Sequence, residues 1–332
     1  NRLSYTFLQS MPDDELFAAA AAQELTTPEQ IASHVTRLTQ SQRARLMSQD
    51  FYERWLGLGE LNKLSKSAAL FPAFDDEIRA ALQSELQEFL QHSLWTEGGA
   101  LASFFSASYA FRNSRLSSHY GDSTASGDAL TLIMLSPERS AGILTTGGLM
   151  ALLSTPEHTD PVRRGKFIRE RFLCQVVPPP PPGVSAAFPE FEPGVTTRQR
   201  FATHQNDPVC AGCHSVMDGI GLGFENFDAV GVYRASENGS PVDASGQLVS
   251  SDIDGPFVGV RALAEKLATS QMVRDCMLAS WFRFVAGREA GEGDAGTLAA
   301  LRPVLLSAGQ RSMLEALSQT PAYLSRHQEE AP

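Results

Sequence analysis

The chain has 332 residues, 42% of them hydrophobic, so it can form a substantial core in one large domain or in about two or three smaller ones. Its formal net charge of −11 argues against nucleic acid and anionic membrane surfaces as partners. No run of about 18 apolar residues occurs, so the sequence predicts no membrane-spanning segment. The first residues show no signal-peptide pattern.

The first third of the sequence predicts several helices. Ser10 is predicted to cap a helix that runs through "DDELFAAAAA", and Thr27 followed by Pro28 marks the start of a second one. The clearest helix lies in "DDEIRAALQSELQEFLQHSLW". Apolar residues at spacings of three and four form one face of it: Ile78, Leu82, Leu86, Phe89, Leu90 and Leu94.

The middle of the chain contains a basic helical pattern, "DPVRRGKFIRERFLC", in an otherwise acidic sequence. Its basic residues are Arg163, Arg164, Lys166, Arg169 and Arg171. They form either a solvated helix face or a surface that pairs with acidic groups of the chain or of a cofactor. Five prolines, Pro178 to Pro182, follow and predict a stiff extended connector, which we take as the main internal boundary.

The last third predicts further helices in "PFVGVRALAEKLATS", "MVRDCMLASWFRFVAGRE" and residues 295–306 and 310–317. A small hairpin is predicted with its turn around Ala244 to Gly246. Strand signals are scarce, so the predicted fold class is mainly α with minimal β. The predicted organisation is a helical domain over residues 1–128, a helical segment ending in the polyproline linker over 129–182, and a cofactor-binding domain over 183–332.

One motif in the last third carries recognisable chemistry: Cys210, Cys213 and His214 form a CxxCH sequence. Two thiols at this spacing can reach the two vinyl groups of one porphyrin, and the adjacent histidine can bind the iron, so the motif predicts one covalently attached haem c. A zinc site would need a second ligand pair, and a thioredoxin-like redox pair would need a βαβ context. Both alternatives remain open, as does a chance pair of buried thiols.

The chain resembles the tandem uncharacterised domains attached to planctomycete- and myxobacterial-type c-type cytochromes. The blocks that carry the resemblance run through nearly the whole chain: "RLSYTFLQSMPDDEL", "FYERWLGLGEL", "FPAFDDEIRAAL", "SYAFRNSRLSSHYG", "GILTTGGLMALLS", "DPVRRGKFIRERFLC", "CAGCHSVMDGIGLGFENFDAVGVYR" and "CMLASWFRFVAGRE". Gly219 stands where the family usually has proline. The resemblance implies a cytochrome c-like haem domain in a periplasmic or secreted protein. It also implies a further cytochrome region upstream and no known reaction.

The sixth ligand of the proposed haem iron is not fixed by the motif. His119, in the block "SSHYG", is a candidate sixth ligand or distal residue, and Met272 is a weaker one. Cys174 and Cys276 lie in sequence blocks that match the family. In an oxidising compartment they are a candidate disulfide pair, with two buried free thiols as the alternative.

Three polar residues after the motif, Glu225, Asn226 and Asp228, do not follow the spacing of a calcium loop. We therefore expect them to make turn hydrogen bonds rather than to bind calcium.

Three functions are compatible with the sequence. The first is an electron-transfer haem protein that exchanges electrons with a redox partner protein or a fused cytochrome domain. The second is a haem enzyme of peroxidase or oxidase type with an open or displaceable sixth ligand, and the third is a non-redox structural or binding protein. No HExxH, GxSxG or phosphate-loop motif is present, which favours electron transfer over an enzyme.

Overall fold

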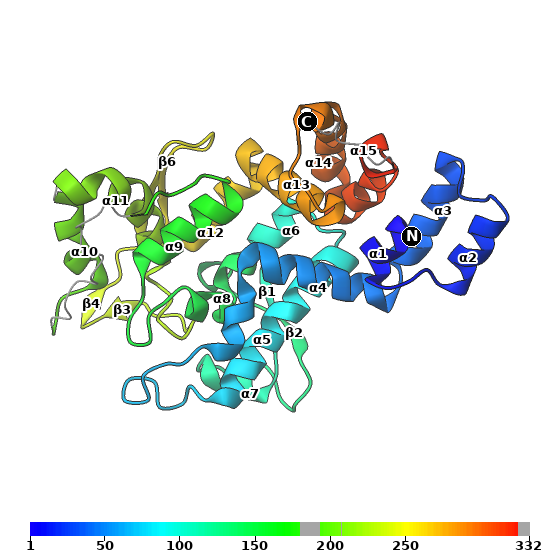
Figure 1. Ribbon diagram of the computed structural model, residues 1–332. Coiled ribbons are helices and arrows are strands. Elements are labelled where there is room, and N and C mark those ends of the chain that lie inside the picture. Colours follow the sequence, from blue (N-terminus) through cyan, green and yellow to red (C-terminus); the bar gives the residue numbers. More distant parts are fainter. Residues whose placement is uncertain (180–192, 207, 325–332) are drawn as a thin grey trace. The chain divides into compact units, whose positions relative to one another are not determined.

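The computed structural model describes residues 1–179, 193–206 and 208–324. The side chains of residues 203–206, 208–211 and 213 lie outside that description. Two compact units make up the chain. The first comprises Asn1–Gly57, Leu90–Leu101 and Arg274–Pro332, and the second comprises Leu58–Phe89 and Ala102–Val273. The predicted mainly α class is confirmed (Figure 1).

Helices joined by short loops form the first unit, and its described residues contain no strand. Its elements are α1 (Arg2–Leu8), α2 (Asp14–Ala21), α3 (Pro28–Thr39), α4 (Gln42–Leu56), the π-helix η2 (His92–Thr96), α13 (Gln271–Ala286) from Arg274 onward, the 3-10 turn η7 (Glu292–Asp294), α14 (Ala295–Leu317) and α15 (Pro321–Leu324).

The second unit combines helices with three two-stranded antiparallel sheets. Its helices are most of α5 (Asp76–Gln91), α6 (Leu101–Ser106), α7 (Ser114–His119), α8 (Gly147–Leu152), α9 (Pro161–Phe167), α10 (Thr197–Asn206), α11 (Pro208–Gly221) and α12 (Gly259–Thr269). Short 3-10 and π-helical turns are η1 (Leu58–Lys63), η3 (Pro137–Arg139), η4 (Gly142–Thr145), η5 (Ile168–Phe172) and η6 (Leu222–Phe224). The strand pairs are β1 (Tyr109–Arg112) with β2 (Thr131–Met134), β3 (Ser236–Glu237) with β4 (Ser240–Pro241), and β5 (Ser245–Leu248) with β6 (Gly255–Val258).

Local signals explain several helix ends. The Gln30 backbone N–H donates to Thr27 Oγ1, and the Thr27 backbone N–H donates to Gln30 Oε1, which completes the predicted start of α3 as a capping box. The prediction of Ser10 as a cap is wrong, because α2 begins later and Asp13 accepts the bond from Leu16 N at 3.0 Å. A carboxylate caps a helix as well as a hydroxyl does.

The core of the first unit is aromatic. The Phe51 ring stacks on Trp281 with 3.4 Å between ring centroids. Gln310 lies beside them, and its Oε1 accepts hydrogen bonds from Tyr52 at 3.0 Å and from Trp281 at 2.9 Å. One amide thereby satisfies the polar atoms of two buried aromatic side chains, which would otherwise cost free energy on burial.

The apolar residues predicted to share one helix face are all buried, which confirms that face; five of them lie on α5, and Leu94 lies on η2 directly after it. The predicted hairpin turn is wrong: Ser245 and Gly246 are strand residues of β5, which pairs with β6. The tight turn instead lies at Asn238 and Gly239, both with positive φ, between β3 and β4. Asn-Gly is the pair most suited to such a turn. No helix in the described ranges is long and apolar enough to cross a membrane.

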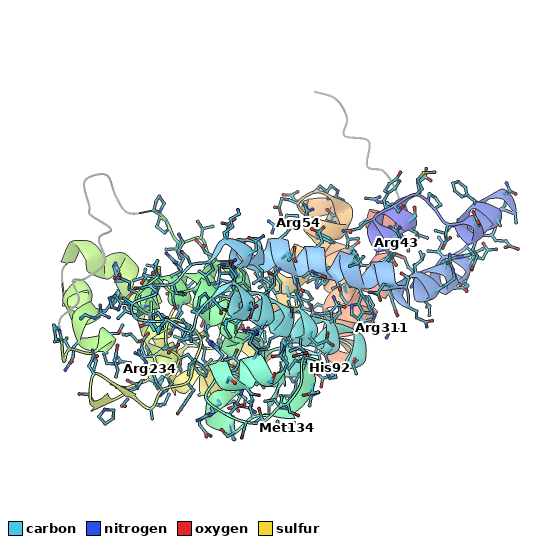
Figure 2. The ribbon with its side chains drawn as sticks, turned by 90° about the horizontal axis from the view of Figure 1, so that it is seen from below. Arg43, Arg54, His92, Met134, Arg234 and Arg311 are labelled. Carbon is cyan, nitrogen blue, oxygen red and sulfur yellow. The ribbon has the colours of Figure 1, made fainter. Side chains whose placement is uncertain are left out.

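A cleft of about 580 Å³ lies in the first unit. Arginine and aromatic side chains line it, among them Arg2, Tyr5, Arg54 and Phe284; Figure 2 labels Arg54, which projects from α4. None of the residues predicted to bind a cofactor is among the described residues that line this cleft.

Candidate functional site

The CxxCH motif lies on α11, in the second unit. Positions 210 and 213 are three residues apart on this helix and therefore share one face, with His214 next to them. The side chains of Cys210 and Cys213 lie outside the described residues, whereas the His214 side chain is described and is 20% exposed. The structure thus brings the three motif positions together within about one helical turn.

A buried carboxylate contacts the His214 ring. Both carboxylate oxygens of Asp218 lie 3.0 Å from His214 Nδ1, and the Asp218 side chain is 0% exposed. Burial raises the pKa of Asp218 to about 6, and the nearby His214 opposes that rise. At neutral pH the carboxylate is therefore mostly ionised and accepts the hydrogen of Nδ1–H. This tautomer leaves the lone pair of the imidazole on Nε2, the nitrogen that a metal needs.

Sequence reasoning missed Asp218. The signal was its position four residues after His214, because residues at this spacing face one another on a helix. α11 continues past the motif to Gly221 and so carries Asp218 onto the same face as the histidine.

Close packing of α9 fixes α11 from one side, and Figure 1 shows the two helices next to each other. A Cβ atom at Gly165 would collide with the main chain of Met217, and one at Gly221 would collide with the main chain of Pro161. These two glycines therefore permit a backbone approach that a side chain would prevent. Met217 is buried at this contact.

Arg169 fixes α11 from the same direction. It is 2% exposed, and its Nε donates to Val216 O at 2.8 Å while Nη2 donates to Val249 O at 2.6 Å. Its Nη1 donates to Gln175 Oε1 at 2.5 Å. One guanidinium thereby connects the carboxyl-terminal part of α11 to the segment after β5.

Arg164 is a second buried arginine of the basic segment, with 0% exposure. Its Nη1 donates to Phe224 O at 3.0 Å and to Phe227 O at 2.9 Å. It also forms an ion pair with Glu225, N to O 3.4 Å. The solvated-face interpretation of this segment is therefore wrong for Arg164 and Arg169, while pairing with an acidic residue of the chain holds for Arg164.

Glu225 connects three segments of the chain. In addition to Arg164 it accepts hydrogen bonds from Thr159 Oγ1 at 2.7 Å and from Arg234 Nη2 at 2.8 Å, and Figure 2 labels Arg234 near the β3–β4 turn. Burial raises the pKa of Glu225, and the two arginines oppose this rise.

The other two polar residues of this segment make turn contacts, as expected. Asn226 Nδ2 donates to Arg234 O at 3.0 Å, and Asp228 Oδ1 accepts from Val230 N and Val232 N at 2.9 Å each. These hydrogen bonds close the loop that follows η6.

His119 lies at the end of α7. Its Nε2 is 3.0 Å from Val230 O, and its ring packs near Phe74 and Tyr120. None of these partners belongs to α11, and Figure 1 shows α7 and α11 in different parts of the second unit. Burial lowers the pKa of His119. Its role as a sixth ligand stays a prediction.

Met272 lies in the first turn of α13, where its backbone N–H donates to Asp252 Oδ2 at 3.3 Å. Its role as a ligand also stays a prediction. Cys174 and Cys276 are both disulfide-bonded, and their pairing with each other remains a prediction. Among the described side chains, no group of three histidine, cysteine or acidic residues is arranged to hold a metal ion.

Comparison with protein families divides the chain into two matched regions. Residues 1–121 match the family PSD4, described as a protein of unknown function (DUF1592), and residues 140–237 match PSCyt3, described as a protein of unknown function (DUF1588). The two matched regions follow one another along the chain, which agrees with the tandem arrangement that the resemblance implies. The second region includes the CxxCH motif, Asp218 and Glu225. Searches of curated proteins and of solved structures found no match.

Proposed function

We propose that the chain is a c-type cytochrome that carries one covalent haem c on α11 and acts in electron transfer. Cys210 and Cys213 would form the thioethers, and His214 would bind the iron through Nε2. The observation that carries the proposal is the contact between His214 Nδ1 and the buried Asp218 carboxylate. Histidine ligands commonly donate their second ring N–H to such a group, which fixes the tautomer and the ring orientation.

Two further observations support this function. The name of the second matched family, PSCyt3, contains the usual abbreviation of cytochrome. Disulfide-bonded Cys174 and Cys276 suit an oxidising compartment, such as the periplasm or the exterior of the cell, where haem c proteins are also expected.

Each part of the site has a separate task. When bound, haem c supplies a one-electron couple between ferric and ferrous iron. The two cysteines would anchor the group, and His214 would hold the iron. Asp218 would hold the proton on Nδ1, while Arg169, Gly165 and Gly221 keep the helix that carries His214 against its neighbours.

The test is to produce the protein together with a haem-attachment system. We expect the purified chain to gain the mass of one haem, to show a c-type absorption spectrum and to be reduced and reoxidised reversibly. The double variant Cys210→Ala/Cys213→Ala should lose the covalent haem. Gly212→Ala, between the two cysteines and with no described atom within 4 Å of its Cβ position, should keep it.

Wild-type protein that carries no haem under these conditions would overturn the proposal. Ligand binding separates electron transfer from the enzyme alternative. A low-spin spectrum that is unchanged by carbon monoxide and cyanide supports electron transfer. High-spin iron that binds both ligands quickly would instead support the function of a haem enzyme.

A further inference from the structure

Asp218 differs from Glu225, another buried acid of the second unit, in how its charge is compensated. Glu225 is paired with two arginines, Arg164 and Arg234. Among the described residues, the ion pair that Asp218 makes is with His214. The negative charge of Asp218 is therefore directed at the imidazole and is not neutralised by a guanidinium.

We infer that Asp218 makes the haem of this chain a low-potential centre, suited to donating electrons to partners of higher potential. The inference rests on the proposed function, because it concerns the ligand His214. Asp218 is a positioning residue that acts through the imidazole and does not touch the iron.

The electrostatic argument is direct. The ferric form carries one more positive charge than the ferrous form, so a fixed negative charge behind the proximal imidazole favours the ferric form. A carboxylate that accepts the Nδ1 hydrogen also raises the basicity of the ligand, which stabilises the higher oxidation state. Because Asp218 is fully buried, solvent screens its charge less than it would at the surface.

Asp218 is also held in place, because its neighbours on α11 are fixed in turn. Arg169 donates to Val216 O, and the main chain of Met217 packs against Gly165. Gly219 lies against β5, where a Cβ atom would come 3.1 Å from Gln247 O. The helix therefore cannot rotate to release the carboxylate without breaking these contacts, and the charge stays directed at His214.

The experiment compares midpoint potentials of haem-loaded proteins by optical spectroelectrochemistry. We expect Asp218→Asn to shift the midpoint potential upward, and Asp218→Glu, which keeps the charge, to shift it less. The control is Asp252→Asn. Asp252 belongs to the same unit and accepts a hydrogen bond from Ser270 Oγ at 2.6 Å, at the start of α13. This control should leave the potential unchanged.

An unchanged or lower potential in Asp218→Asn, with haem fully attached, would overturn the inference while leaving the proposed function intact. The proposed function is tested separately by the haem content of the wild-type protein, because wild-type protein that takes up no haem would overturn that function.

A second measurement covers the case in which Asp218→Asn takes up no haem. In the ¹⁵N NMR spectrum of the haem-free wild-type chain, His214 should be protonated at Nδ1. In Asp218→Asn it should lose this preference. Protonation of wild-type His214 at Nε2 alone would contradict the inference.

Discussion

Arg164 and Glu225 form an ion pair that is shielded almost completely from solvent, with side-chain exposures of 0% and 2%. The pair lies within the region that matches the second family, and Arg164 also donates to the backbone carbonyls of Phe224, at the end of η6, and of Phe227, after it. Removing one partner of a buried pair leaves an uncompensated charge, which is more damaging than the loss of the contact itself.

Glu225→Leu is therefore expected to lower the free energy of unfolding by about 3–5 kcal/mol. Urea unfolding followed by circular dichroism measures the change. The matched control is Glu60→Gln, because Glu60 pairs with Lys63 at 3.0 Å while both side chains are 69% exposed, and it should cost less than about 0.5 kcal/mol. Equal effects of the two variants would contradict the role given to burial.

The packing of α9 against α11 predicts that Gly165 and Gly221 do not accept a side chain. Gly165→Ala or Gly221→Ala should destabilise the protein by roughly 2 kcal/mol or more, because the collisions involve the rigid main chains of Met217 and Pro161. Gly212→Ala, on the same helix but with no described atom within 4 Å of its Cβ position, should be neutral or slightly stabilising. Thermal unfolding of the three variants tests this, and a stable Gly165→Ala would refute the close approach.

Glu85 is buried, and the Tyr120 hydroxyl donates to it at 2.5 Å. Burial raises the pKa of Glu85 from 4.5 to about 7, opposed by the Tyr120 hydrogen bond, by Arg112 and by the Gly147 backbone, while Asp122 adds to the rise. The folded state thus binds the proton more tightly than the unfolded chain. The stability that this provides is present below pH 4.5 and is lost as the pH rises through about 7.

Glu85→Gln mimics the protonated form of Glu85, so the variant should not lose stability as the pH rises through about 7. Since a tenfold change in proton affinity is worth about 1.4 kcal/mol, the variant should be more stable than wild type by on the order of 3 kcal/mol at pH 8 and about equal to it at pH 4. Urea titrations at both pH values give the difference. Glu88→Gln, at an exposed position of the same helix, serves as the control and should show no such pH-dependent gain.

The cap of α2 predicts different effects on stability for substitutions at Asp13 and at Ser10. Asp13→Ala removes the bond to Leu16 N and an ion pair with Arg37 at 2.6 Å, so it should cost about 1–2 kcal/mol. Ser10→Ala lies outside the helix and should change the unfolding free energy by less than about 0.5 kcal/mol. Chemical unfolding measures both changes. A larger loss of unfolding free energy in Ser10→Ala than in Asp13→Ala would show that Ser10 is the cap after all.

Features that depend on local sequence were predictable. The face of α5 follows from apolar spacing, Thr27 caps α3 through contacts within four residues, and the break between residues 306 and 310 matches non-helical Gly309 inside α14. The CxxCH positions are recognisable for the same reason.

Features that depend on distant parts of the chain were not predictable. Composition does not show which arginines of a basic segment are buried, because Arg164 and Arg169 also bond to backbone carbonyls about 50 or more residues away along the chain. The turn at Asn238 and Gly239 had a local signal, but the pairing of β5 with β6 comes from tertiary contacts. Asp218 became visible only once α11 was known to continue past the motif.

Arg169 restricts which sequences this fold can accept. Its three nitrogens serve Val216, Val249 and Gln175 at once, in a planar arrangement. Lysine has the same charge but concentrates its donors on one nitrogen, so it could not span the same three acceptors. Position 169 should therefore tolerate neither a neutral residue nor the other common cation, and a change there would require coordinated changes in segments far away along the chain.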